Sequence, residues 1–192
     1  MNDLPPLYIL RHGETEWNVV TRLQGRLDSP LTELGRAQAL DQGRILAQAS
    51  IMSTELRISP SGRAIKTAEL ALPDKMAEAV IDPRLVEVDL GAWQGCTPAQ
   101  VAQMAPDLDM SDPHLWKFTS PGGESLSAMT ERCRAVLAEL TRPTILVTHG
   151  VTSRVLRCLA LGRPPEALSA VAGGQGIVHF IAEGRAEILG LR

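Results

Sequence analysis

Four short runs of hydrophobic residues interrupt an otherwise mixed chain of 192 residues. The first run is bounded by Pro5-Pro6 and Gly13, and the second is followed by Ser59-Pro60. Runs of this length between such boundaries are typical of strands that are buried on both faces. We expect strands at 8–10, 56–58, 79–82 and 144–148.

Helical patterns fill the segments between these runs. Apolar side chains recur with helical spacing along one later segment, at 126, 129, 133, 136, 137 and 140. This stripe makes Cys133 a core residue and not a reactive thiol. Thr32 and Ser61 are suitable N-caps for two further helices. We expect these helices over 33–49 and 62–71, and another over 150–160.

The C-terminal region has the pattern of a hairpin. Gly184 separates "GIVHFIAE" from "RAEILGL", which predicts two antiparallel strands. Apolar strands that alternate with helices predict a mainly parallel sheet with helices on both faces. The sequence therefore indicates an α/β fold, a three-layer αβα sandwich with the antiparallel hairpin at one edge of the sheet.

The stretch 96–123 breaks the alternation of strands and helices. It contains four prolines, and we expect it to be irregular and to form a partial cap over one end of the sheet. Large apolar side chains in this stretch and just before it could form either a lid or a small satellite core, and the two are equally compatible with the sequence. These side chains are Trp93, Met104, Met110, Trp116 and Phe118. The length fits a single domain, 1–192, with this excursion.

Composition excludes several classes of protein. The net charge is −3 and no run of lysine or arginine occurs, which disfavours nucleic acid and anionic membranes as partners. No apolar run approaches the roughly 18 residues of a membrane span, and the N-terminus lacks the pattern of a signal peptide. Three cysteines without a CxxC pair indicate a reduced, cytoplasmic protein.

Cationic side chains follow two of the predicted strands. Arg11 and His12 end the first strand, and His149 ends the strand at 144–148. Arg63 lies in the first turn of the helix over 62–71, where free N–H groups favour an anion. Ligands of such sheets bind beyond the carboxyl ends of the strands. The sequence therefore predicts a site for a dianion, and phosphate is the commonest biological one.

Other phosphate and hydrolase chemistries lack their motifs. No cysteine-phosphatase loop, P-loop or Gly-x-Ser-x-Gly occurs, and no His/Cys/carboxylate cluster has the spacing of metal ligands. An aspartyl-phosphate motif is imitated at 107–111, but it follows Ala-Pro and not an apolar strand. The remaining nucleophile is a histidine. Of the other two histidines, we expect His179 to be structural and His114 to lie at the surface.

Six segments resemble the histidine phosphatase superfamily, also called the phosphoglycerate mutase-like family. They span nearly the whole chain in the family's order: "LRHGETEWN" (10–18), "RLQGRLDSPLTELGRAQA" (22–39), "SPSGRAIKTA" (59–68), "LVEVDLGAWQG" (85–95), "PGGES" (121–125) and "VTHG" (147–150). The resemblance implies a phosphoglycerate mutase-like fold.

The resemblance also implies a role for each site residue. His12 is the nucleophile that becomes phosphohistidine, and Glu87 is the proton donor. The phosphoryl group is held by Arg11, Arg63 and His149, and Asn18 contacts its oxygens. The substrate site is lined by Gln24, Gly25 and Gly150. The carbonyl of Gly13 fixes the His12 tautomer. No metal or cofactor is required, and we expect Glu87 to have a raised pKa because it must donate and accept a proton.

Within this family the sequence favours a phosphatase over a mutase. A mutase must hold a second phosphate, yet Lys117 is the only lysine or arginine in 96–123. "PGGES" and "LQG" resemble the small phosphatase branch, and Gly25 precedes Arg26 where mutases carry Gly-Trp. We expect a metal-independent hydrolase of a small-molecule phosphomonoester. Phosphoglycerate mutase chemistry and a non-catalytic phosphate-binding role are the alternatives, and no pattern bears on the oligomeric state.

Overall fold

One sheet contains all six strands of the computed structural model, which describes residues 4–49, 51 and 53–190. The strands are β1 (Leu7–Arg11), β2 (Glu55–Ile58), β3 (Val80–Ile81), β4 (Thr144–Thr148), β5 (Val178–Ala182) and β6 (Arg185–Leu189). Their order is β3-β2-β4-β1-β5-β6; the first four are parallel to one another, and β5 and β6 run antiparallel. The predicted sheet and its antiparallel edge are confirmed.

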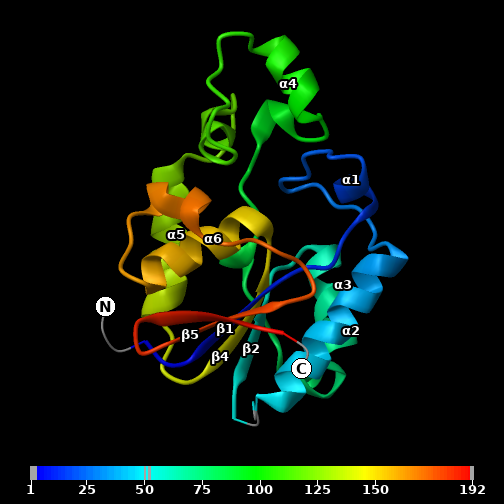
Figure 1. The fold of residues 1–192 in the computed structure, drawn as a ribbon, viewed down its shortest axis with the longest axis vertical. Coiled ribbons are helices and arrows are strands. Elements are labelled where there is room, and N and C mark those ends of the chain that lie inside the picture. The colour runs from blue at the N-terminus through cyan, green and yellow to red at the C-terminus, as the bar shows by residue number, and fades with distance from the viewer. Residues whose placement is uncertain (1–3, 50, 52, 191–192) are drawn as a thin grey trace.

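Helices cover both faces of this sheet (Figure 1). The α-helices of the described chain are α1 (Glu16–Val19), α2 (Glu33–Gln48), α3 (Gly62–Ala71), α4 (Pro98–Met104), α5 (Leu126–Ala138) and α6 (Gly150–Ala160). Side chains of β1 alternate between two cores: Leu7 and Ile9 pack with α5 and α6, whereas Tyr8 and Leu10 pack with α2 and α3. The predicted αβα sandwich is therefore confirmed.

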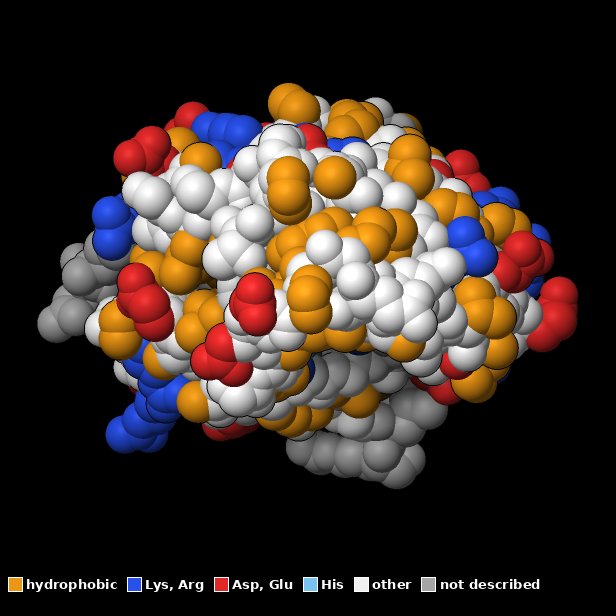
Figure 2. Space-filling view, turned by 90° about the horizontal axis from the view of Figure 1, so that it is seen from above, with side chains coloured by type: hydrophobic (Ala, Val, Ile, Leu, Met, Phe, Trp, Pro, Cys, Tyr) orange, Lys and Arg blue, Asp and Glu red, His pale blue; other side chains and the backbone are white. Residues whose placement is uncertain are grey.

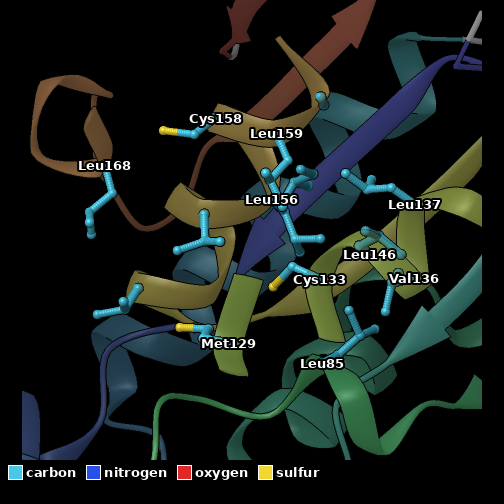
Figure 3. Close-up of a cluster of buried hydrophobic side chains, with 14 of the residues drawn as sticks. Leu85, Met129, Cys133, Val136, Leu137, Leu146, Leu156, Cys158, Leu159 and Leu168 are labelled. Atoms are coloured by element: carbon cyan, nitrogen blue, oxygen red, sulfur yellow. The ribbon is translucent and has the colours of Figure 1, made fainter. Parts of the chain in front are cut away.

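The hydrophobic stripe of α5 forms much of the larger core, which Figure 3 shows in close-up. Met129, Cys133, Val136 and Leu137 are fully buried there, beside Leu156 of α6. Cys133 is surrounded by these apolar side chains, and burial raises the pKa of its thiol to about 12. The prediction that Cys133 is a core residue is confirmed.

The two predicted N-caps differ in the structure. The Thr32 hydroxyl accepts a hydrogen bond from the Gly35 N–H at 3.0 Å and caps α2 as expected. Ser61 occupies the N-cap position of α3, but its side chain makes no capping bond. Its hydroxyl lies 3.4 Å from Nε2 of His149 instead. The predicted N-cap position of Ser61 is therefore confirmed, but its side chain does not cap the helix.

The segment 96–123 is more regular than predicted. It contains α4, because Thr97 and Gln100 form a capping box and Pro98 takes a first-turn position that needs no N–H donor. This helix stands at the end of the molecule that is uppermost in Figure 1. Figure 2 looks onto that end and shows hydrophobic side chains among uncharged ones, with acidic and basic side chains interspersed.

The apolar side chains of this segment form a satellite core and not a lid. Trp93 and Trp116 pack with their ring centroids 5.8 Å apart, and Val101 and Met110 lie against them. Met104 is outside this cluster and 55% exposed. Phe118 packs against the main core, the one that Figure 3 shows.

The two histidines set aside by sequence differ in burial. His179 is buried, and its Nδ1 lies 3.2 Å from Nη1 of Arg157, as expected for a structural group. His114 is a half-buried residue of the cap, and its Nδ1 lies 3.1 Å from Nζ of Lys117. The prediction of a surface position for His114 is wrong, because the side chain is partly enclosed and contacts Lys117. Among the described helices, none has the length and apolarity needed to cross a bilayer.

Candidate active site

His12 and His149 meet because β1 and β4 are adjacent parallel strands. Each histidine follows the last residue of its strand, and Arg11 is paired in register with Thr148. The backbone N–H of His12 donates to the Thr148 carbonyl at 3.0 Å. The centroids of the two imidazole rings are 5.2 Å apart. The predicted convergence at the carboxyl end of the sheet is confirmed.

The His12 ring is fixed in one tautomer. Its Nδ1 lies 2.7 Å from the Gly13 carbonyl, which can only accept, so Nδ1 carries the proton and Nε2 is left as a free base. Burial, followed by His149 and Arg11, holds the pKa of His12 well below 6.5. The ring is therefore neutral at physiological pH, as a nitrogen nucleophile must be.

The backbone under His12 is held by two facing glycines. A Cβ added to Gly13 would collide with the carbonyl of Gly35, and one added to Gly35 would collide with the carbonyl of Glu14. The Gly13 N–H donates to Thr67 Oγ1 at 3.0 Å, and that hydroxyl donates to the Arg63 carbonyl at 2.8 Å. The end of β1 is therefore joined to α2 by backbone contact and to α3 by the Thr67 hydroxyl.

Two arginines present unpartnered nitrogens at this position. The Arg63 side chain is 1% exposed, and its Nη1 and Nη2 donate to groups of the 25–28 loop. The Nε atoms of Arg63 and Arg11 are buried and have no hydrogen-bond partner among the described residues. Because buried N–H groups are almost always paired, these two nitrogens are suited to an anion.

His149 presents a third such nitrogen. Its Nε2 lies 2.7 Å from the Ser59 hydroxyl, whereas its Nδ1 is buried and, within the described residues, has no partner. Burial, and then Arg63 and Arg11, hold the pKa of His149 well below 6.5. The ring is neutral and keeps one nitrogen for a ligand.

Glu87 lies against the first turn of α6, which its carboxylate caps. Oε2 accepts from the Val151 N–H at 3.1 Å, and Oε1 accepts from the N–H of Thr152 at 3.1 Å and from that of Val88 at 3.0 Å. Burial raises the pKa of Glu87, but these three N–H groups and Arg63 outweigh it and leave the pKa below 4.5. The expected raised pKa is therefore wrong for the unliganded site.

These groups surround a cavity of about 130 Å³. Seven of the nine predicted site residues line it: Arg11, His12, Asn18, Gln24, Gly25, Arg63 and Glu87. The other two, His149 and Gly150, are not among the residues that line it. A Cβ on Gly150 would sit 3.5 Å from Arg11 Nε and 3.7 Å from Glu87 Oε2, so this glycine lies between those two side chains.

The loop residues of the site are held by their own hydrogen bonds. Asn18 Oδ1 accepts from the Thr15 N–H at 3.1 Å and from Gln175 Nε2 at 3.3 Å. Gln175 Nε2 also donates to the His12 carbonyl at 3.1 Å. Gln24 Nε2 donates to Thr15 Oγ1 at 2.6 Å. Because both donors to the Asn18 oxygen belong to the protein, its amide nitrogen is left for a ligand.

Two basic residues in the cavity wall went unassigned in the sequence. Arg22 belongs to one of the family segments, and Lys117 comes from the 96–123 segment. Neither forms an ion pair with an acidic side chain of the described chain. Burial lowers the pKa of Lys117, although Glu87 opposes this. In the sequence, Lys117 is notable only as the sole lysine or arginine of 96–123, and this does not predict that it lies at the cavity.

The described residues hold no group of three or more His, Cys, Asp or Glu side chains arranged for a metal ion. The cationic side chains that line the cavity are the guanidinium groups of Arg11, Arg22 and Arg63 and the ammonium group of Lys117.

Similarity to known proteins extends over nearly the whole chain. A glucosyl-3-phosphoglycerate phosphatase of Mycolicibacterium vanbaalenii is 37% identical, over 91% of this chain and 82% of its own length. A probable phosphoglycerate mutase of Proteus mirabilis is 34% identical, over 82% of this chain and 75% of its own length. The solved structure of mycobacterial glucosyl-3-phosphoglycerate phosphatase in complex with VO3 superimposes with a TM-score of 0.81 and 32% identity, covering 97% of this chain and 98% of that one. The sequence model of the histidine phosphatase superfamily (branch 1) matches residues 7–183, and the chain belongs to this family.

Proposed function

We propose that the chain is a phosphomonoester hydrolase that works through a phosphohistidine on His12. The observation that carries the proposal is the pairing of a neutral His12, whose Nε2 is free, with three buried nitrogens that lack partners in the described chain. These belong to Arg11, Arg63 and His149. A phosphoryl group that is attacked by Nε2 would satisfy all three.

In the first step, Nε2 of His12 forms a bond to phosphorus as the bond from phosphorus to the ester oxygen breaks. Arg11, Arg63 and His149 balance the charge on the phosphoryl oxygens. Ser59 Oγ and Nε2 of His149 are 2.7 Å apart, and we assign the hydroxyl as the donor. The ring then carries its proton on Nδ1, where it meets the anion. The leaving oxygen takes a proton from Glu87 and departs as an alcohol.

In the second step, water attacks the phosphohistidine. Glu87, now ionised, accepts a proton from the water, the N–P bond breaks, and inorganic phosphate leaves with His12 restored. One ester and one water are converted to one alcohol and one phosphate, and no metal or cofactor takes part.

The proton of the first step enters with the substrate. In the unliganded site Glu87 is held ionised by the N–H groups of α6, and His12 is neutral. A phosphate monoester that binds as its monoanion brings one proton, and its charge beside Glu87 favours transfer of that proton to the carboxylate. Gly150 allows this because no side chain separates Glu87 from Arg11.

The substrate we propose carries a second negative group near its phosphate. Lys117 and Arg22 line the cavity without acidic partners in the described chain. A partly buried ammonium whose neighbour is the neutral His114 ring, and not a carboxylate, favours an anion beside it. A phosphoglycerate ester offers a carboxylate at this position, and two of the relatives named above are glucosyl-3-phosphoglycerate phosphatases. We propose this compound as the first substrate to assay.

The remaining expectations complete the proposal. We assign 1–192 to a single domain in which 96–123 forms a partial cap that brings Lys117 to the cavity. A cytoplasmic location accords with cysteines that are all unpaired.

Mutase chemistry is the second candidate because probable phosphoglycerate mutases are among the relatives. Incubation with 3-phosphoglycerate and 2,3-bisphosphoglycerate separates the two: a hydrolase releases phosphate, and a mutase forms 2-phosphoglycerate.

A quenched reaction with a 32P-labelled ester tests the proposal. Label should be trapped on the wild-type protein and be absent from His12→Ala, which should also lose turnover. The bond should be labile in acid and stable in alkali, since protonated imidazole is a good leaving group. Label that is lost in alkali and kept in acid, or His12→Ala with a tenth of the wild-type rate, would contradict the nucleophile assignment.

A further inference from the structure

The two helices that open onto the cavity share an unusual feature at their N-termini. Neither α3 nor α6 receives a capping hydrogen bond from its own N-cap side chain, Ser61 or His149. A carboxylate from elsewhere in the chain takes that place in both. At α6 it is Glu87, and at α3 it is Asp28.

Asp28 binds Arg63 at two points. Its Oδ2 accepts from the backbone N–H of Arg63 at 3.2 Å, and its Oδ1 lies 2.8 Å from the guanidinium Nη1. Asp28 belongs to a loop 35 residues earlier in the sequence. The fold makes room for it at Gly62, where a Cβ would lie 2.5 Å from Oδ2. One carboxylate therefore fixes both the main chain and the side-chain end of Arg63.

These contacts determine which part of the guanidinium faces the cavity. Nη1 donates to Asp28 and to the Leu27 carbonyl at 2.6 Å, and Nη2 donates to the Gly25 carbonyl at 2.9 Å. Of the five N–H groups, three are used by this loop, and the Nε–H remains without a partner in the described chain. A guanidinium anchored on one side can present only its other side to an anion.

We infer that Asp28 is a positioning residue that orients Arg63 for the transferring phosphoryl group. The inference rests on the proposed phosphatase function and adds a residue that does not itself touch the phosphate. The Asp28 side chain is 42% exposed, whereas that of Arg63 is 1% exposed and would be left as a buried charge without its partner. Loss of Asp28 should therefore lower stability as well as transition-state binding, and a double-mutant cycle in kcat isolates the second effect.

A double-mutant cycle tests this role. Asp28→Ala should lower kcat on p-nitrophenyl phosphate by about 10- to 100-fold, the loss typical of a misplaced catalytic group, and weaken orthovanadate binding by a similar factor. In an Arg63→Gln background the same change should cost less than about twofold, because the group that it orients is gone. Asp28→Asn keeps an acceptor oxygen and should recover most of the activity.

Asp41→Ala is the matched control, since it breaks an ion pair of 2.7 Å to Arg44 on α2 and should leave kcat unchanged. If Asp28→Ala does not fold, Asp28→Ser replaces it in the cycle, because its shorter side chain removes the guanidinium contact. Equal losses in the two backgrounds, or a lowered melting temperature with kcat unchanged, would overturn the inference.

Orthovanadate binding, measured by calorimetry without turnover, separates the two proposals. A wild-type chain that neither hydrolyses esters nor binds vanadate overturns the phosphatase proposal and this inference with it. A wild-type chain that binds vanadate, with an Asp28→Ala variant that binds it equally well, overturns the role of Asp28 alone.

Discussion

The backbone N–H of Thr152 donates to the Glu87 carboxylate at 3.1 Å in the first turn of α6. Peptide N–H groups at a helix N-terminus stabilise an ionised carboxylate. The residue assigned as a proton donor is therefore held in its deprotonated form until substrate binds. This relationship determines how the rate should depend on pH.

We expect kcat/KM for an alkyl phosphate to fall about tenfold for each pH unit above about 6, the second pKa of a phosphate monoester. The pKa of Glu87 is below 4.5 and that of His12 is well below 6.5, so neither group titrates in this range and only the substrate does. A pH–rate profile between about pH 5 and about pH 8.5 measures this fall in kcat/KM, in a range that lies above the pKa of Glu87. A constant kcat/KM across neutral pH would show that the free enzyme keeps its own proton on Glu87.

Glu87→Gln should separate substrates by their leaving groups. An alkyl phosphate needs protonation of its leaving oxygen, and we expect kcat to fall by about 10²- to 10⁴-fold. p-Nitrophenyl phosphate leaves without a proton and should lose about tenfold or less. Glu33→Gln, at a side chain that is 99% exposed on α2, is the control. Equal losses on the two esters would assign the proton transfer to another group.

Turnover should survive an excess of EDTA. The positive charges at the cavity belong to Arg11, Arg22, Arg63 and Lys117, which a chelator does not remove. We expect the rate to stay within about 20% of that without chelator. Loss of a catalytic metal, which contributes several kcal/mol, would instead lower the rate by orders of magnitude. Loss of activity that is restored by a divalent cation would contradict the proposed mechanism.

Lys117→Met should impair substrates that carry a second acid. For 3-phosphoglycerate we expect KM to rise about tenfold, as for the loss of one hydrogen bond to a charged group. For glycerol 3-phosphate, which lacks the carboxylate, the rise should be below about twofold. Lys66→Met removes a surface lysine that is paired with Glu69 and serves as the control. An equal rise for both substrates would mean that Lys117 acts on the phosphate itself.

His179 should make the fold sensitive to acid. Burial, and then Arg157 and Arg154, lower the pKa of His179 from 6.5 to about 4, while the unfolded chain keeps the ordinary value. Below pH 6.5 the unfolded chain therefore takes up a proton that the folded one excludes, and stability falls with pH down to about 4. The cost is about 1.4 kcal/mol per pH unit.

His179→Gln should remove this dependence. The amide oxygen of glutamine can accept from Arg157 as Nδ1 does, without binding a proton. Urea denaturation at several pH values should show a shallower loss of stability in the variant. The other histidines are unchanged in the variant. Parallel curves of unfolding free energy against pH for the two proteins would therefore show that folding does not lower the pKa of His179.

Sequence reasoning found the groups whose positions depend on the ends of strands. Arg11, His12 and His149 could be brought together on paper because carboxyl ends of adjacent parallel strands meet. The sequence predicted only a common edge of the sheet; the adjacency of β1 and β4, which brings the two rings to 5.2 Å, came from the structure. Glu87 came from family resemblance alone, and its environment could not be predicted, because two of the three N–H groups that hold it lie 64 and 65 residues further along the chain.

The cap was harder to predict. The prolines of 96–123 indicated irregular structure, whereas Pro98 begins α4 at a position where proline is tolerated. Lys117 reaches the cavity because the segment is held by the satellite core around Trp93 and Trp116. That path depends on contacts between distant side chains, which local patterns do not contain.

The facing glycines Gly13 and Gly35 separate what can vary in this enzyme from what cannot. Backbone touches backbone beneath His12, so any side chain at either position would displace the nucleophile. Residues 96–123 are tied to the site differently. Lys117 lines the cavity, and its segment is held in place by the side-chain packing of the satellite core. New substrate preferences are therefore accessible through exchange of the cap, by evolution or by design, while the reaction chemistry is inherited intact.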